Sequence, residues 1–587
     1  MRRRGGIGTV LAVALIGGLM QMAPVASAND IAPARADIDG SKTVEYIIKT
    51  RHGHIYAEAV HPTSNGKIVK SPTVLTYSPY SVLGRNGDAD ELVPRGYTRM
   101  YADVVGTGNS GGCYDYGGKR EKQTGFDVVE WIADRKWSTK KVAMEGGSYD
   151  GTTAIAAATQ APPHLTTIVP QVAISRWYEY AYSGGIRYLY TSEFAGNRGL
   201  GGAIEEGFDT PLAFDFGFAV PPPVDVANDE WAERVESSTT PCDELKHTEH
   251  GYDFDTPDYD KFWLERDYVR NAHKMDMPVL IAGNWGDWNV KQEGGYNLYK
   301  ALRRTGNKDT HLYFGSRWRG HSAPDSDGTF SKLMLRWLDH HLKGERNGIG
   351  RLAPVTTQTA DSEGGGEFTS GPSTRNVTLF PQHDGDSGAD YPWRLLPGEP
   401  NKKSGAPAAR FAALGTNFEM GANAEPHANL TSFRFETPPL TRDARLFGKV
   451  KVKLFSSIDR KWVTVTPTIV DVEGDSSSSL VSVTRGFLDS RYRNGLGQTK
   501  ALEPGKPFGM TVVEKPTDYT FRKGHRIALS VQTEMNEWMV AKRNPACEGV
   551  GDDCAMFRIH WEGGRSKLVL PVVGAPKNPN KLFISEG

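Results

Sequence analysis

Short apolar runs alternate with helix-like segments from about residue 43 to residue 345, and this rhythm restricts the fold more than any other feature of the sequence. Turn residues bound each run, as expected for strands that are buried on both faces of a parallel sheet. Helical patterns such as TGFDVVEWIADR and GGYNLYKALRRT separate several of the runs, so we expect an α/β domain built on a mostly parallel sheet. The runs are TVLTY (73–77), TRMYADVV (98–105), KVAMEG (141–146), TTIVPQVA (166–173), PVLIAGN (278–284) and HLYF (311–314).

The alternation of strand-like and helix-like segments is interrupted once, and it ends near residue 345. Residues 185–275, approximately, are rich in glycine, proline, aromatic and acidic residues, which predicts a cap inserted into the first domain (43–345). After the helix-like segment FSKLMLRWLDHHLKG, residues 351–587 contain β-branched runs between Gly, Pro and Asp turns and few helix signals. This pattern is typical of an all-β sandwich, and we expect a jelly-roll-like domain there. A chain of 587 residues is also too long for one compact core.

The N-terminus has the pattern of a targeting segment. Three arginines precede an apolar stretch, and Ala-Ser-Ala at 26–28 fits a cleavage site of the A-x-A type. The apolar run is shorter than the roughly 20 residues that a membrane-spanning helix needs, which disfavours the alternative of a membrane anchor. We therefore expect a signal peptide over residues 1–28, an arginine-rich signal of bacterial type, and a secreted protein with no membrane contact after cleavage.

Charge gives no indication of a polyanionic partner. Lys plus Arg number 69 and Asp plus Glu 70, and no long run of one sign occurs. The usual electrostatic argument for nucleic acid or an anionic membrane is therefore missing. The oligomeric state is left open by the sequence.

The four cysteines are even in number, and an exported protein can form disulfides. Cys547 and Cys554 flank a short turn-rich loop, so we expect them to pair, which leaves Cys113 with Cys242 among the three possible pairings. A zinc site is less favoured because the cysteines lack paired C-x-x-C spacing.

The segment MEGGSYDGTTA (144–154) places Ser148 between a strand-like run and a helix-compatible run. A strand-to-helix turn that presents a serine needs small residues on either side, because its backbone is tight and strained. The hydrolase elbow G-x-S-x-G is nearly present, but Asp150 stands two residues after the serine and the glycine follows at Gly151. From this motif alone, Ser148 is either a nucleophile or a serine in a glycine-rich turn.

Serine needs a base and an acid that orients the base, in the hydrolase chain order Ser, Asp, His. Asp287 follows the strand-like run PVLIAGN, and His321 follows HLYF, so both are expected at the carboxyl edge of the sheet. Tyr80 follows TVLTY and could donate to a developing oxyanion together with the backbone N–H of Tyr149. Each residue has an ordinary alternative: a turn cap for Asp287, a surface or core position for His321, and packing under a loop for Tyr80.

Several segments together resemble the Xaa-Pro dipeptidyl-peptidase and cocaine esterase family of α/β-hydrolases. The resemblance covers nearly all of the chain after the signal peptide, and G-x-S-Y-x-G followed by D-W-N-V is its most specific part. The family places its second glycine three residues after the serine, which accounts for the spacing seen here. The segments are SPY, DVVGTGNSGG, GGSYDGT, AISRWYEY, GDWNVK, GH and PTDYTFRKGHRIALSV.

The resemblance implies an α/β-hydrolase fold with Ser148 as nucleophile, Asp287 as acid and His321 as base. It also implies an oxyanion hole formed by Tyr80 and the amide of Tyr149. No metal or organic cofactor is implied. One departure is Val105 in DVVGTGNSGG, where the family commonly has arginine.

The motifs AISRWYEY and DWNVK are most similar to the Xaa-Pro peptidases of the family. By that match Trp177 would pack on the prolyl ring of a peptide with proline in second place, and Asn289 would help to hold its free α-ammonium. We name Glu193 as the expected acidic partner of that ammonium, with an exposed loop charge as the alternative. The expected function is a serine exopeptidase that releases Xaa-Pro dipeptides. An esterase or acylase on the same fold, and a non-catalytic secreted binding protein, are the alternatives.

Overall fold

The computed structural model describes most of the chain: residues 38–80, 89–188, 258–287, 289–316, 320–324, 328–359, 369–370, 373–383, 393–399, 409–412, 432–473, 480–533 and 556–583. The predicted signal peptide, most of the predicted cap and Glu193 lie outside these residues. Cys113 is disulfide-bonded, but Cys242, Cys547 and Cys554 also lie outside, so the pairing stays a prediction. None of the helices in the described segments is long and apolar enough to cross a membrane.

The first sheet has eleven strands within the described residues, in the order β1-β2-β5-β4-β6-β7-β10-β11-β12-β13, with β3 paired to β2. Each pair of neighbours from β5 to β12 is parallel, as predicted, and the six apolar runs all form strands of this part. The long antiparallel strands β1 and β2 were not predicted, and they extend the sheet beyond β5. The strands are β1 (Gly40–Thr50), β2 (Gly53–Ser64), β3 (Lys67–Ile68), β4 (Ser71–Ser78), β5 (Thr98–Asp103), β6 (Ser138–Gly147), β7 (Leu165–Gln171), β10 (Val279–Asn284), β11 (Thr310–Gly315), β12 (Val355–Thr357) and β13 (Thr369–Ser370).

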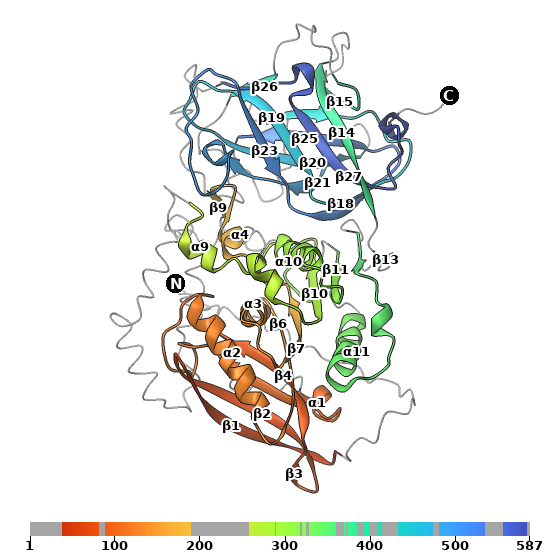
Figure 1. The fold of residues 1–587 in the computed structure, drawn as a ribbon. Helices are drawn as coiled ribbons and strands as arrows, with labels where there is room; N and C mark the ends of the chain where they lie inside the picture. Colours follow the sequence, from red (N-terminus) through yellow and green to blue (C-terminus); the bar gives the residue numbers. More distant parts are fainter. Residues whose placement is uncertain are drawn as a thin grey trace, which may run out of the picture.

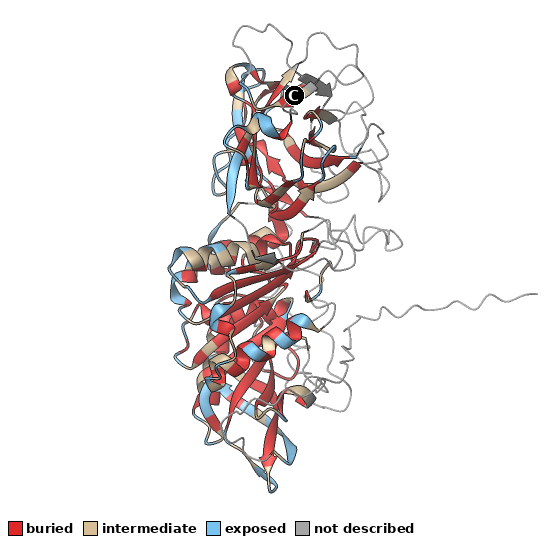
Figure 2. Cartoon of the chain, turned by 90° about the vertical axis from the view of Figure 1, so that its right-hand side faces the viewer, coloured by how far each residue is buried: buried red, intermediate tan, exposed pale blue. Residues whose placement is uncertain are grey.

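Helices cover both faces of the parallel part, which explains why its strands are apolar without alternation. Successive side chains of a strand point to opposite faces: Met144 of β6 lies in the core cluster with α2, α3 and α10, whereas its neighbour Ala143 lies in a cluster with α11. Figure 2 shows these strands as buried along most of their length. The main helices are α2 (Lys119–Ala133), α3 (Tyr149–Ala158), α10 (Glu293–Arg304) and α11 (Thr329–Lys343).

The second sheet carries fourteen strands in the part of the chain that the structure describes, and nearly all of their pairings are antiparallel. After Lys343, the described residues form only strands and short 3-10 helices, so the all-β prediction is confirmed there, whereas the jelly-roll arrangement stays a prediction. The strands are β14 (Thr374–His383), β15 (Trp393–Leu396), β16 (Ala409–Ala412), β17 (Ser432–Glu436), β18 (Ala444–Gly448), β19 (Lys451–Ser457), β20 (Thr464–Val472), β21 (Leu480–Arg485), β22 (Leu488–Asp489), β23 (Phe508–Val513), β24 (Thr517–Phe521), β25 (Arg526–Gln532), β26 (Met556–His560) and β27 (Lys567–Val573).

The two sheets meet through packed helices and buried polar contacts. In Figure 1, α10, α4 (Trp177–Ala181) and α9 (Lys261–Glu265) lie between them. Asp518 of β24 accepts a hydrogen bond from Thr357 of the first sheet (3.2 Å) and also pairs with Arg445. One continuous hydrophobic cluster runs from the parallel sheet into the C-terminal domain.

Candidate active site

Ser148 stands at a sharp turn between β6 and α3. Its backbone has φ 58° and ψ −124°, a conformation that non-glycine residues rarely adopt and that is held at a cost by the surrounding structure. The turn is closed by its backbone: the Ser148 N–H donates to the carbonyl of Gln171 (2.9 Å), and the Ser148 carbonyl accepts the first helical bond from Thr152 (3.0 Å). The segment MEGGSYDGTTA therefore forms a sharp strand-to-helix elbow with Ser148 at the turn.

The unusual glycine spacing follows from close backbone approaches at the elbow. A Cβ on Gly151 would lie 2.6 Å from the carbonyl oxygen of Gly146, and a Cβ on Gly146 would lie 2.4 Å from the Cβ of Asp150. The first turn of α3 thus packs directly on the end of β6 at the third residue after the serine. Asp150, two residues after the serine, has room for a side chain and is buried.

Asp287 and His321 form the second part of the site. His321 Nδ1 lies 3.1 Å from Asp287 Oδ2, and Asp287 is 1% exposed. The other oxygen, Oδ1, accepts the backbone N–H groups of Asn289 (3.0 Å) and Val290 (3.1 Å). Both carboxylate oxygens are therefore fixed, and the one that faces the imidazole is presented in a defined direction.

Asn284, the last residue of β10, holds the histidine loop and was missed by the sequence analysis. Its side-chain Nδ2 donates to the carbonyls of Gly320 (3.2 Å) and Ser322 (2.5 Å), the two neighbours of His321. Asn284 is fully buried. The sequence signal that could have identified Asn284 is its position as a polar residue at the end of the apolar run PVLIAGN.

Tyr80 approaches Ser148 from the end of β4. Its hydroxyl donates towards Ser148 Oγ across 3.4 Å. Ser78 fixes the backbone of Tyr80 from both sides, because its Oγ accepts from the Tyr80 N–H (3.1 Å) and donates to the Tyr80 carbonyl (3.0 Å). This position fits a donor to an oxygen that is bound next to Ser148.

Topology explains how these residues reach one region. Tyr80, Ser148, Asp287 and His321 follow β4, β6, β10 and β11, which run parallel in one sheet. The carboxyl ends of parallel strands lie at the same edge, where ligands of open α/β sheets bind. The two contacts, Tyr80 with Ser148 and His321 with Asp287, therefore belong to the same edge.

The predicted substrate residues are placed less completely. Trp177 begins α4, is 1% exposed, and packs against Tyr149 with ring centroids 5.1 Å apart. Its Nε1 donates to the hydroxyl of Tyr268 (2.9 Å). Asn289 is half-buried beside Asp287. Contacts of Trp177, Asn289 and Glu193 with a substrate stay predictions.

A buried acid next to the Ser148 elbow, Glu121, was also missed by the sequence analysis. The hydroxyl of Tyr149 donates to Glu121 Oε2 (2.8 Å), and Tyr114 bonds to the same hydroxyl (2.8 Å). Burial, followed by the negative charge of Asp115, raises the pKa of Glu121 to about 8. In the sequence, Glu121 resembles any other charge in the first turn of a helix.

Comparison with known families identifies the class of enzyme. The model of the X-Pro dipeptidyl-peptidase family (S15) matches residues 53–321, and the model of the X-Pro dipeptidyl-peptidase C-terminal non-catalytic domain matches residues 347–568. The chain belongs to the X-Pro dipeptidyl-peptidase family. It is therefore a serine hydrolase, and the alternative of a non-catalytic binding protein is set aside.

Relatives within the X-Pro dipeptidyl-peptidase family are distant. A putative Xaa-Pro dipeptidyl-peptidase of Bacillus cereus is 27% identical over 476 residues, which cover 77% of this chain and 73% of the relative. The Xaa-Pro dipeptidyl-peptidase of Ligilactobacillus salivarius is 25% identical over 508 residues, covering 75% of this chain and 59% of the relative.

Solved structures of other proteins support the fold of this chain. An α-amino acid ester hydrolase is 20% identical, with 94% of this chain and 100% of that chain covered and a TM-score of 0.67. An aminopeptidase from a marine sediment archaeon is 17% identical, with coverage of 94% and 99% and a TM-score of 0.66. Both likenesses show an α/β-hydrolase fold followed by a β domain, and they show the fold alone.

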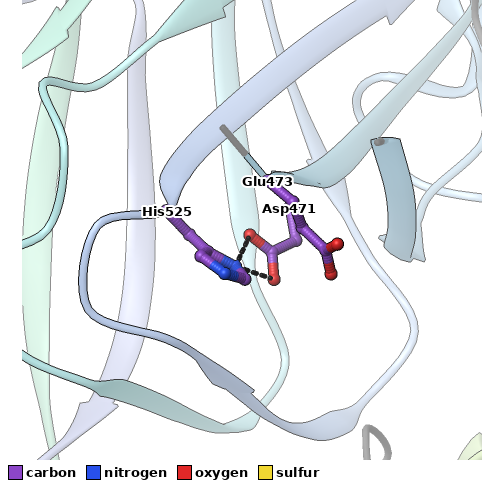
Figure 3. A group of neighbouring side chains, drawn as sticks. All are labelled: Asp471, Glu473 and His525. Carbon is purple, nitrogen blue, oxygen red and sulfur yellow. Dashed lines mark hydrogen bonds and ion pairs between the residues drawn. The ribbon is translucent and has the colours of Figure 1, made fainter. Parts of the chain in front are cut away.

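One group of possible metal ligands in the described residues lies outside this site, in the C-terminal β domain of the protein. The ligand atoms of Asp471, Glu473 and His525 lie within 4.8 Å of one another (Figure 3). Asp471 already accepts hydrogen bonds from His525 Nδ1 (3.0 Å) and from the hydroxyl of Tyr519 (2.8 Å). These contacts account for the cluster, so we assign no metal to it, and the absence of a cofactor stays an expectation.

Proposed function

We propose that this protein is a secreted serine exopeptidase that releases Xaa-Pro dipeptides from the N-termini of peptides. The observation that supports the proposal best is the hydrogen bond between His321 and Asp287 at the sheet edge that also carries the Ser148 elbow. The names of the relatives, Xaa-Pro dipeptidyl-peptidases, support the substrate class. Secretion, from a bacterial cell, is proposed from the N-terminal segment, and N-terminal sequencing of the mature protein should begin near Asn29.

The proposed reaction is acyl transfer through Ser148. Asp287 accepts the Nδ1–H of His321 and so keeps the Nε2 lone pair available for the proton of Ser148. Ser148 Oγ then attacks the carbonyl carbon of the prolyl residue. The tetrahedral oxygen is held by Tyr80 and the Tyr149 N–H, His321 returns the proton to the leaving amine, and water releases the dipeptide in a second, equivalent cycle.

Selection of Xaa-Pro dipeptides requires two further contacts. A prolyl ring offers an apolar face and no N–H, so an aromatic surface suits it, and Trp177 is the proposed partner. The free α-ammonium needs fixed oxygen acceptors, for which Asn289 and Glu193 are proposed. These acceptors would set the two-residue distance between the N-terminus and the bond that is cleaved.

An esterase or acylase is the second candidate. The same nucleophile, base and acid cleave esters and amides, and the α-amino acid ester hydrolase shares the fold. Of the residues that would separate the two activities, Glu193 belongs to the predicted cap and lies outside the described segments, whereas Trp177 and Asn289 lie within them. Asn289 and Glu193 would be dispensable in an enzyme that does not bind an ammonium.

Initial rates on three substrates test the proposal: a chromogenic Ala-Pro amide, its N-acetylated form and a simple aryl ester. We expect rapid cleavage of the free amine, little cleavage of the acetylated form, and a loss of several orders of magnitude on all substrates in Ser148→Ala with an unchanged melting temperature. Cleavage of the ester without cleavage of the Ala-Pro amide would replace the peptidase by the esterase. Full activity of Ser148→Ala would reject the assignment of the nucleophile.

A further inference from the structure

We propose that Glu121 is a positioning residue of this active site: its buried carboxyl group holds the side chain of Tyr149, and through it the Tyr149 backbone N–H of the oxyanion hole. The inference rests on the proposed function, because it takes Ser148 as the nucleophile and this N–H as an oxyanion donor. Glu121 itself does not touch the substrate.

The hydrogen bonds around Glu121 Oε2 form a hub behind the elbow. Tyr149 is fully buried and its hydroxyl donates to this oxygen (2.8 Å), so the bond between Tyr114 and Tyr149 (2.8 Å) must be donated by Tyr114. The backbone N–H of Gly117 donates to the same oxygen (3.0 Å). Two hydrogen bonds thus converge on one carboxyl oxygen, and one of them fixes the residue that follows the nucleophile.

Glu121 is fixed in turn by the loop that precedes α2. Its backbone N–H donates to Asp115 Oδ1 (3.2 Å), and Arg266 donates to the carbonyls of Asp115 (2.7 Å) and Tyr116 (2.8 Å). The hydroxyl of Tyr268 donates to the Gly117 carbonyl (2.6 Å). The carboxyl group therefore stands on a loop that is held from a second segment of the chain.

The anchor matters because the elbow is strained. Ser148 has a positive φ, and strained backbone persists only where its surroundings determine it. Tyr149 is the first residue of α3, so its ring and its N–H move together with the start of the helix. Oxyanion donors are effective only when they are aimed in advance at the developing charge, and a small rotation of this peptide weakens them.

The charge around Glu121 also fits a neutral carboxyl group at pH 7. Burial, and after it Asp115, raises the pKa of Glu121 to about 8. Of the nearby cations, Arg266 and Lys122 donate to backbone carbonyls, and Glu121 Oε1 has no hydrogen-bond partner among the described residues. The other titratable groups that interact with the charge of Glu121 are Tyr77, Tyr149 and Tyr268, and Tyr114 contacts Tyr149.

Ionisation should therefore weaken catalysis. Above pH 8 a buried negative charge would stand next to the residue whose N–H must stabilise an oxyanion, and like charges disfavour that transition state. We expect the kcat of the wild-type enzyme to fall as the pH rises through about 8.

Glu121→Gln and Glu121→Ala test the inference in the full mature chain, with an uncharged aryl ester as substrate so that no substrate ammonium titrates. Gln keeps an oxygen for Tyr149 but cannot ionise: we expect a kcat near that of the wild type at pH 7 and no decline between pH 7.5 and 9. Ala removes the anchor, and we expect kcat to fall about 10- to 100-fold with KM within about twofold. Glu130→Gln is the matched control, because Glu130 lies on the same helix and pairs with His164 at the surface.

The outcomes separate this inference from the proposed function. The positioning role is wrong if Glu121→Gln shows the wild-type alkaline decline and Glu121→Ala keeps the wild-type kcat and KM. If the alanine variant does not fold, the kcat and KM of Glu121→Gln are used instead. If Ser148→Ala still hydrolyses the ester, the proposed nucleophile is wrong, whatever the Glu121 variants do. A loss of melting temperature alone, with unchanged kcat, would reduce Glu121 to a structural residue.

Discussion

Asp287 shows how much of the proposed chemistry depends on the direction of single hydrogen bonds. Its Oδ1 is occupied by two backbone N–H groups, so only Oδ2 is available to His321. The side chain cannot turn without losing bonds that would be left unsatisfied in a buried place. In the proposed mechanism, Asp287 therefore selects one tautomer and one orientation of the imidazole.

Asp287→Asn should keep the fold and remove most of the activity. An amide group that preserves the two backbone bonds would direct its NH2 at His321 Nδ1 and favour the tautomer with the proton on Nε2. We expect kcat on the Ala-Pro amide to fall by roughly 10³- to 10⁴-fold with little change in melting temperature.

Asp339→Asn is the control for Asp287→Asn, because Asp339 is a buried acid on α11 that bonds Tyr97 and Lys343 and contacts none of the proposed catalytic residues in the described structure. It should lower the melting temperature and leave the kcat of the folded enzyme unchanged. Equal kcat losses in both variants would contradict the specific role of Asp287.

Strand β6, the elbow and helix α3 act as one unit. The apolar run before Ser148 and the small residues after it predicted a strand and a helix, and both are present as β6 and α3. The close approach of α3 to β6 explains why glycine occurs at 146 and 151. Gly147, by contrast, is exposed, and a Cβ added to it would meet no atom within 4 Å. The elbow is therefore constrained on its buried side and open on the other.

Alanine substitutions at Gly146, Gly151 and Gly147 should differ in their effect on the free energy of unfolding. Gly146→Ala and Gly151→Ala force backbone shifts in a packed region, and we expect each to cost about 1–3 kcal/mol in the free energy of unfolding, together with a loss of activity. Gly147→Ala should change the free energy of unfolding by less than about 0.5 kcal/mol, as surface substitutions usually do. Urea denaturation of the three variants measures this difference, and equal stability of all three would contradict the packing argument.

The two domains are joined by a buried ion pair. Lys515 of the C-terminal domain lies 2.5 Å from Glu293 at the start of α10, and both side chains are less than 10% exposed. Opposite charge on Glu293 raises the pKa of Lys515, which opposes the effect of its burial. Because α10 follows the Asp287 loop closely, this pair ties the C-terminal domain to the segment that carries the acid.

Lys515→Met should destabilise the whole molecule. It leaves the Glu293 carboxylate buried without its partner, which typically costs about 3–5 kcal/mol. Lys506→Met is the matched control: Lys506 pairs with Glu503 on the surface of the same domain and should leave the urea midpoint unchanged. If Lys515→Met also leaves the midpoint unchanged, the pair does not hold the domains together.

The sequence predicted the elements of the molecule well, because their signals are local. The six apolar runs became strands of the parallel sheet, and the helix-like segments became α2, α10 and α11. Strands β1 and β2 were missed because neither has the sequence of an apolar run. β1 is exposed along much of its length, and β2 (GHIYAEAVHPTS) is mostly buried but carries His, Glu and Pro among its apolar residues. The boundaries of the predicted cap and of the jelly roll stay predictions.

The sequence by itself determined the order and spacing of Ser148, Asp287 and His321, because chain order and residue type are local properties. Only the tertiary structure decided which contacts form between distant segments: the loop of His321 on Asn284, Tyr149 on Glu121, and Lys515 on Glu293. Each of these depends on burial, which removes water as a competing partner and makes one geometry much better than all others. Burial arises from packing across the fold, and no short stretch of sequence carries that information.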